Sequence, residues 1–261
     1  MDIYQRKGTF TMKKWLSLLL AGWMLVSLAS CNPAPQETSA ETTPPVTTDA
    51  PDPGPQPPFS LDGKTFIFLG SSVTYGSASG GWSMADYIAE NNDCTVYKWA
   101  KSGTTLVDNG SDSYVQRMLS GMRRYSYCDH FIVQLSTNDA TQGKPLGKLS
   151  DSMNKDDFDT STVIGAMEYI IASAKEKYNC EVSFYTGTRY DSGAYQNMVN
   201  ALDKIAEKWD IGIIDLWDDP DMNKVSDADY ARYMSDSIHP TRVGYEEWWG
   251  PKFQEHLAQY Q

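Results

Sequence analysis

Residues 66–72 read Phe66-Ile67-Phe68-Leu69-Gly70-Ser71-Ser72, an apolar run that ends in a glycine and two serines. Consecutive apolar residues before a glycine are typical of a buried strand that feeds a turn. Ser72 would then lie on the loop at the carboxyl end of this strand, just before a helix candidate. The stretch therefore predicts where the folded part of the chain begins and where its first reactive side chain lies.

Four later segments predict further strands, because they are rich in β-branched, aromatic and other apolar residues: 94–100, 131–135, 182–186 and 211–216. Apolar residues at helical spacing predict helices between and after them, over 84–89, 114–125, 162–178, 194–209 and 241–260. Strands that alternate with helices indicate parallel pairing with right-handed crossovers. The sequence therefore predicts an α/β fold, a three-layer α/β/α sandwich on a five-stranded parallel sheet.

The first thirty residues have the order of an export signal. Met12-Lys13-Lys14 is a basic start, residues 15–28 form an apolar run, and Leu28-Ala29-Ser30-Cys31 ends it. The run is short for a membrane span. It resembles a bacterial lipoprotein signal, in which the cysteine is lipidated and becomes the new N-terminus. We therefore predict a signal peptide over 1–30, a lipidated Cys31 and an extracytoplasmic protein held by a membrane lipid anchor; an uncleaved anchor or an ordinary signal is the alternative.

The next segment, residues 31–58, consists mostly of Pro, Thr, Ala, Ser and acidic residues, as in Pro51-Asp52-Pro53-Gly54-Pro55. Such a composition cannot bury a core and predicts a disordered linker. The remaining residues, 59–261, are enough for one domain with a sizeable core. We expect the lipid and the linker to hold this domain off a membrane surface.

The chain carries a net charge of −12. This acidity disfavours nucleic acid and anionic lipid headgroups as partners, whereas neutral substrates remain acceptable. Besides Cys31 there are Cys94, Cys128 and Cys180, with no Cys-x-x-Cys pattern and no Cys/His cluster, so a structural zinc site is not expected. A disulfide between Cys128 and Cys180 and three buried thiols both remain open, with the thiols favoured. The sequence does not predict the oligomeric state.

Residues that can carry chemistry follow successive predicted strands. Ser72 follows the first strand, Gly103 the second and Asn138 the third, while Asp236 and His239 follow the fifth after a longer loop. Ligands of such sheets bind outside the carboxyl ends of the strands, so all five residues are expected to meet at one edge. An acid-held histidine and a serine form a nucleophilic site, and N–H and amide groups can donate to an oxyanion. Each match alone would fit an ordinary turn, but their joint placement favours catalysis.

These blocks resemble the SGNH (GDSL-type) hydrolase family, over roughly Lys64 to Leu257. The matching blocks, in the family's order of Gly-Asp-Ser, glycine, Gly-x-Asn-Asp and Asp-x-x-His, are Gly70-Ser71-Ser72, Gly103, Ser136-Thr137-Asn138-Asp139 and Asp236-Ser237-Ile238-His239. The resemblance implies the flavodoxin-like SGNH hydrolase fold and a serine hydrolase that acts on ester bonds.

Carried over to these positions, the resemblance implies that Ser72 is the nucleophile, His239 the general base and Asp236 the group that orients it. The N–H groups of Ser72 and Gly103 and the Asn138 amide would form the oxyanion hole.

Two positions depart from the family pattern. Ser71 replaces its aspartate and Ser136 its glycine. Neither change removes a catalytic atom, but Ser71 lacks a carboxylate that would help to fix the surrounding loops. We expect the departure to affect the rate and the pocket shape more than the reaction class.

Other polar candidates are expected to be structural. His130 precedes the third strand, at the edge opposite the site, and His256 lies in the last helix. Asp215, Asp218 and Asp219 belong to an acidic loop that is expected to be solvated. We assign no metal and no cofactor.

The substrate is expected to be a carboxylic ester, either a small molecule or a polysaccharide. An exported, acidic esterase with polar, glycine-rich loops around its site fits removal of O-acetyl groups from carbohydrate. Tyr75, Trp82 and Trp99 have aromatic faces that suit sugar rings, although core packing explains them equally well. Long acyl chains are less favoured because no long apolar lid is evident. A lipase or lysophospholipase-type acyl hydrolase and a non-catalytic glycan-binding lipoprotein on the same fold are the alternatives.

Overall fold

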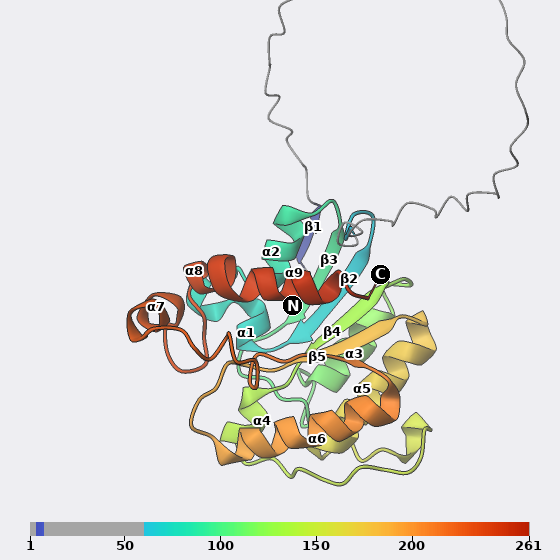
Figure 1. Cartoon of the computed structure of the whole chain (residues 1–261). Coiled ribbons are helices and arrows are strands. Elements are labelled where there is room, and N and C mark those ends of the chain that lie inside the picture. The colour runs from blue at the N-terminus through green and yellow to red at the C-terminus, as the bar shows by residue number, and fades with distance from the viewer. Residues whose placement is uncertain (1–3, 8–59, 261) are drawn as a thin grey trace, which may run out of the picture. The chain divides into compact units, whose positions relative to one another are not determined.

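The computed structural model describes residues 4–7 and 60–260 (Figure 1). The strands are β1 (Tyr4–Lys7), β2 (Thr65–Gly70), β3 (Thr95–Ala100), β4 (His130–Gln134), β5 (Glu181–Tyr185) and β6 (Gly212–Ile214). The α-helices are α1 (Ser72–Tyr75), α2 (Met84–Asn91), α3 (Tyr114–Met122), α4 (Thr137–Thr141), α5 (Val163–Tyr178), α6 (Gly193–Trp209), α7 (Asp227–Tyr233), α8 (Arg242–Gly244) and α9 (Gly250–Leu257). The shorter turns are η1 (Ser77–Ser79), η2 (Lys155–Asp157) and the π-helical η3 (Tyr245–Trp249). Apart from β1, the predicted signal peptide, Cys31 and the predicted linker lie outside the described residues.

The sheet has the strand order β1-β3-β2-β4-β5-β6. The five strands from β3 to β6 pair in parallel, so the predicted five-stranded parallel sheet is confirmed. Counting only these five in chain order gives 2-1-3-4-5, the flavodoxin-like arrangement. The short β1 adds an antiparallel edge strand, paired with β3 from Tyr4↔Lys98 to Lys7↔Thr95, which the sequence analysis did not predict.

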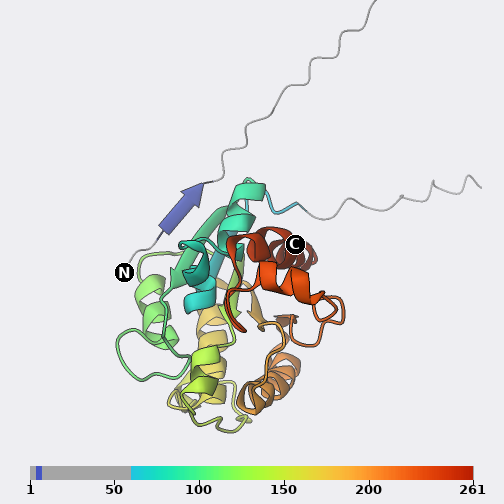
Figure 2. The same ribbon diagram turned by 90° about the vertical axis from the view of Figure 1, so that its left-hand side faces the viewer.

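Helices cover both faces of the sheet (Figures 1 and 2). One face packs against α3, α5 and α6 in a core that includes Ile67, Leu69 and Phe131. The other packs against α2, η3 and α9 in a core that includes Phe66 and Phe68. Since β2 is apolar on both sides, it can lie only where both faces are covered, and it lies inside the parallel sheet between β3 and β4.

The carboxyl end of β2 leaves no room for a side chain. A Cβ atom on Gly70 would lie 1.7 Å from Thr74 Oγ1 and 2.8 Å from Gln134 Oε1. Glycine is therefore required here, because the chain must turn sharply into α1 while staying against β4. This turn delivers Ser72 to the edge of the sheet at the first residue of α1.

The helices predicted over 162–178 and 194–209 match α5 and α6 closely, and those predicted over 84–89 and 114–125 match α2 and α3 within three residues. The single helix expected over 241–260 is divided into α8, the π-helical η3 and α9, with Tyr245 and Trp249 both buried in the core. The one- or two-turn helices α1, α4 and α7 were not predicted. Segments this short contain too few turns to show an apolar periodicity.

His130 and His256 share one buried hydroxyl, far from the edge that carries Ser72. Ser183 Oγ lies 2.8 Å from His130 Nε2 and 3.3 Å from His256 Nε2. Burial lowers the pKa of His130 to about 3 and that of His256 to about 4. Both rings are neutral parts of the packing at neutral pH.

We predict that this pair makes folding sensitive to mild acid. Both folded pKa values lie below the ordinary value of about 6.5, so the stability is complete above pH 6.5 and is lost as the pH falls towards 4. At pH 5 each histidine would cost about 2 kcal/mol relative to pH 7 or above. In His256→Gln, the fall in melting temperature between pH 7.5 and pH 5 should be smaller than in the wild type. Equal falls in the two proteins would contradict the prediction.

Candidate active site

Three side chains from the two ends of the domain form one hydrogen-bonded chain. Ser72 Oγ lies 2.8 Å from His239 Nε2. On the other side of the ring, His239 Nδ1 lies 2.8 Å from Asp236 Oδ2 and 3.0 Å from Oδ1. The geometry is that of a serine held by an imidazole that is itself held by a carboxylate.

The position of the proton on His239 follows from the bonds to Asp236. Burial opposes ionisation of this carboxyl, but the N–H groups of Ile238 and His239, 2.7 and 2.8 Å from Oδ1, and the imidazole ring hold its pKa below the ordinary value. An ionised carboxylate can only accept, so Nδ1 must carry the proton and donate it. Nε2 is then free to accept the proton of the Ser72 hydroxyl.

The acid and the base lie on a loop that closes on itself. Met234 pairs with Pro240 across its neck, and the N–H of Ser235 donates to the His239 carbonyl at 2.9 Å. Asp236 spans the same loop through the bonds to Ile238 and His239. The spacing between acid and base is therefore fixed within one short segment.

The peptide unit before the nucleophile is held on both sides. The carbonyl of Gly70 accepts from Arg117 Nη2 at 2.5 Å and from the N–H of Lys101 at 3.2 Å. The N–H of Ser71 donates to Gln134 Oε1 at 2.8 Å, and the same oxygen accepts from Thr74 Oγ1 at 2.9 Å. Because the bonds to Gly70 and Ser71 use main-chain atoms, they fix the loop without the family aspartate; the Ser71 side chain is fully buried.

The predicted oxyanion donors lie on two connected loops. Gly103 has a φ of +78°, a conformation that glycine adopts readily, and its N–H has no acceptor among the described residues. Asn138 Nδ2 donates to the Thr104 carbonyl at 2.9 Å, which orients the amide and leaves its second N–H for a ligand. Gly103 and Asn138 are thus tied together through Thr104.

The buried carboxylate of Asp139 also connects the loop of Gly103 to the loop of Asn138. Asp139 is fully buried and accepts from the N–H groups of Leu106 and Val107, at 2.7 and 3.1 Å. Burial raises the pKa of this carboxyl, and the hydrogen bonds to it act in the opposite direction. Asp139 follows Asn138 directly, so the bond couples the loop after β3 to the start of α4.

Arg117 on α3 provides a third tie between these loops. Its guanidinium is buried, and it donates to Gly70, to the Asp112 carbonyl and, at 2.8 Å, to Thr104 Oγ1. It also lies 5.0 Å from the centre of the Tyr114 ring. The turn at Ser72 and the loop that carries Gly103 therefore share one buried donor.

All five predicted site residues lie around the same edge of the sheet, and three supporting residues were missed. Gln134 could have been found, because a polar residue in the apolar run 131–135 is unusual for a buried strand. Asp139 belongs to the matched block Ser136-Thr137-Asn138-Asp139, but the sequence analysis gave it no role. Arg117 gave no signal, since one arginine on an amphipathic helix is ordinary.

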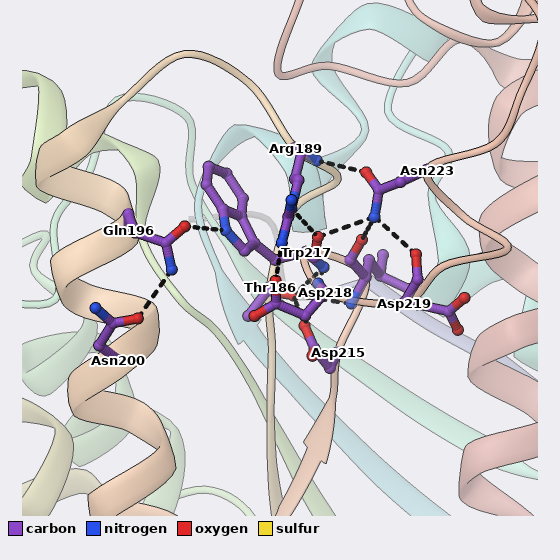
Figure 3. Close-up of polar contacts among 10 residues, drawn as sticks. Thr186, Arg189, Gln196, Asn200, Asp215, Trp217, Asp218, Asp219 and Asn223 are labelled. Atoms are coloured by element: carbon purple, nitrogen blue, oxygen red, sulfur yellow. Dashed lines mark hydrogen bonds and ion pairs between the residues drawn. The ribbon is translucent and has the colours of Figure 1, made fainter.

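The aromatic and acidic residues that the sequence analysis considered for the site have structural surroundings of their own. Trp82 and Trp99 are buried in the two cores, whereas Tyr75 is 43% exposed. Figure 3 shows that Asp215 and Asp218 belong to a loop network: Asp215 Oδ1 accepts from Thr186 Oγ1 at 3.1 Å, and Asp218 pairs with Arg189.

The remaining candidates concern thiols, metals and membranes. Cys94, Cys128 and Cys180 are all free thiols. Over residues 60–260 no three His, Cys, Asp or Glu side chains lie close enough to hold a metal ion. In the same range, no helix has the length and apolar character needed to cross a membrane.

The family can now be named from the sequence as a whole. A model of the GDSL-like lipase/acylhydrolase family matches residues 68–247, so the chain belongs to this family. Membership implies hydrolysis of an ester bond. The match begins within β2 and extends past His239, and so includes every residue of the site described above. No curated protein matches the sequence.

Solved structures share the fold at low sequence identity. One from Lactobacillus plantarum has a TM-score of 0.63 and 18% identity, covering 77% of this chain and 99% of its own. A candidate GDSL-like lipase from Bacteroides ovatus has a TM-score of 0.53 and 20% identity, covering 75% and 98%. A candidate lipase from Chitinophaga pinensis has a TM-score of 0.53 and 18% identity, covering 75% and 96%. At such identities the likeness concerns the fold alone.

The Asp139 contact leads to a prediction about rate. In Asp139→Asn the amide oxygen can accept only one of the two N–H bonds, and its NH₂ group would face the other donor. We expect kcat for p-nitrophenyl acetate to fall roughly tenfold, or about 1.4 kcal/mol of barrier, with KM within about twofold. Asp151→Asn, which changes an exposed carboxylate, is the matched control. The role given to Asp139 is wrong if both variants keep the wild-type kcat.

Proposed function

We propose that the protein is a serine esterase that removes O-acetyl groups from carbohydrate. Ser72 is the nucleophile, His239 the general base and Asp236 the group that orients the imidazole. The N–H groups of Ser72 and Gly103 and the Asn138 amide form the oxyanion hole. The observation that carries the proposal is the continuous chain from Ser72 Oγ through His239 to Asp236, with 2.8 Å at each contact.

The reaction follows the positions of the protons. His239 Nε2 accepts the Ser72 proton while Oγ attacks the ester carbonyl. The imidazolium that forms is stabilised by Asp236, whose lowered pKa keeps it ionised. The three donors stabilise the tetrahedral oxyanion, His239 Nε2–H then protonates the leaving alcohol, and water hydrolyses the acyl-enzyme by the same steps in reverse order.

The carbohydrate part of the proposal rests on the surface beside Gly103. A shallow hollow of about 280 Å³ is lined only by small and polar residues: Gly103, Thr104, Thr105, Asn109, Gly110, Ser111, Asp112 and Ser113. Hydroxyl, amide and carboxylate groups suit the hydroxyls of a sugar, and an apolar alcohol or a lipid would gain little there.

Tyr75 adds an aromatic face near the nucleophile. It lies three residues after Ser72 on the single turn α1, so the two side chains share one side of the helix. The ammonium of Lys98 lies 5.8 Å from the ring centre and donates to the Gly81 carbonyl and to Asp86, at 2.7 and 2.6 Å. One side of the ring is thus supported by the protein, and the exposed side is available to stack on a sugar.

The proposed location is outside the cell membrane, on a lipid attached to Cys31. This part rests on the sequence Leu28-Ala29-Ser30-Cys31 and on the polar composition of residues 31–58. An anchored esterase of this kind would act on polysaccharide within reach of the membrane surface.

The first test is hydrolysis of p-nitrophenyl acetate. Ser72→Ala should abolish it, and Asn138→Ala should reduce kcat about a hundredfold, because one oxyanion donor contributes about 3 kcal/mol. Ser77→Ala, which changes an exposed serine in the next turn, should match the wild type. Activity that persists in Ser72→Ala would refute the serine mechanism, and a glycan that binds without hydrolysis would favour the non-catalytic alternative. A loss of less than about threefold in Asn138→Ala would remove that residue from the oxyanion hole.

The second test distinguishes recognition of the sugar from hydrolysis of the ester bond. Stacking of a sugar on Tyr75 should contribute about 1 kcal/mol, so Tyr75→Ala should lower the ratio of kcat/KM for an acetylated oligosaccharide to that for ethyl acetate about fivefold. Tyr127→Ala, which removes a ring that is 58% exposed at the other end of the domain, should leave the ratio unchanged. Acetate release from a panel of acetylated polysaccharides then identifies the glycan. A preference for long-chain esters over all of them would support the lipase alternative.

A further inference from the structure

We propose, resting on the esterase function above, that a small cavity beside Ser72 binds the acyl group and restricts it to acetyl. The cavity lies between α1, the carboxyl end of β4 and the loop after β5. Thr188 and Tyr190 on that loop are its specificity-determining residues.

The near side of the cavity is built from neighbours of the reacting groups. Val73 follows Ser72, Thr137 precedes Asn138 and Ile238 precedes His239, and all three line the cavity. Consider an acyl group on Ser72 whose carbonyl oxygen points towards Gly103 and Asn138. Its alkyl part then points towards the cavity, which lies on the side of β4. The hollow beside Gly103 lies on the side of β3 and remains for the alcohol.

The cavity is small. Its volume is about 10 Å³, which is about the room that one water-sized group needs. The methyl of an acetyl group fits such a space, whereas each further methylene needs a displacement of the wall. Closely packed walls resist such displacements.

The far side of the cavity is polar. Thr188 Oγ1 and the Tyr190 hydroxyl are both buried, and neither has a hydrogen-bond partner among the described residues. The single methyl of an acetyl group fills the space in front of this wall, whereas a longer alkyl chain would press on the two hydroxyls and offer them no hydrogen-bond partner.

The far wall is also rigid. Arg189, between the two specificity residues, donates from Nε to the Trp217 carbonyl at 2.9 Å and pairs with Asp218 (Figure 3). The Tyr195 hydroxyl accepts from the Gly187 N–H at 3.0 Å and donates to the Leu135 carbonyl at 3.2 Å. The Tyr190 ring packs 5.3 Å from Tyr195 and 5.4 Å from Trp217. The loop after β5 therefore cannot yield easily to a longer chain.

The test is the acyl-length profile of the full chain on p-nitrophenyl acetate, propionate and butyrate. Wild-type kcat/KM should fall at least tenfold from acetate to butyrate. Tyr190→Ala, which removes the ring from the far wall, should raise the butyrate-to-acetate ratio about tenfold. Tyr127→Ala removes an exposed ring outside the cavity and should leave the ratio unchanged.

Thr188→Val keeps the side-chain volume and removes the unpaired hydroxyl, so it should raise the butyrate-to-acetate ratio about threefold at an unchanged melting temperature. It tests the cavity even if Tyr190→Ala folds poorly. A wild type that hydrolyses butyrate as well as acetate, or an unchanged ratio in Thr188→Val, overturns the cavity assignment and leaves the esterase function standing. Absence of Ser72-dependent hydrolysis of every ester overturns both.

Discussion

The peptide unit between Gly70 and Ser71 is the point on which the site depends. Its carbonyl is held by Arg117 and Lys101, and its N–H by Gln134, so the plane before Ser72 cannot rotate. The role proposed for Ser72 needs such fixed geometry, because small misplacements of reacting groups cost large factors in rate. The three holding residues come from β4, α3 and the end of β3, which brings the central strands together at the same peptide.

The site is organised mainly by bonds from side chains to the main chain. Gln134 and Arg117 bind the Gly70–Ser71 peptide, Asp139 binds the loop after β3, and Asn138 binds the carbonyl of Thr104 next to Gly103. Backbone groups are present at every position, so these ties persist when the loop side chains change. This explains how Ser71 can stand where the family has an aspartate while the nucleophile turn stays clamped.

The sequence predicted the elements and site positions that follow from local residue patterns, and it missed the contacts that form only when distant segments pack together. The run 66–69 was evident because it is continuously apolar and ends in a glycine, and the long helices because their periodicity extends over many residues. The parallel order of the strands followed from their alternation with helices. The five site residues were proposed because each follows a predicted strand. Arg117 and Asp139 were not assigned roles, since a buried partner across several strands leaves no mark on local spacing. The helices α1, α4 and α7 are too short to carry a period.

The closed loop from Met234 to Pro240 separates catalytic geometry from the length of the chain around it. Asp236 and His239 are bonded to each other and to backbone groups of the same seven residues, so their spacing owes nothing to the segment between β6 and α7. Insertions in that segment can reshape the rim of the site while Asp236 and His239 keep their positions relative to each other. For the proposed esterase, a longer surface loop would therefore change which substrates fit the rim while Asp236 and His239 keep their spacing.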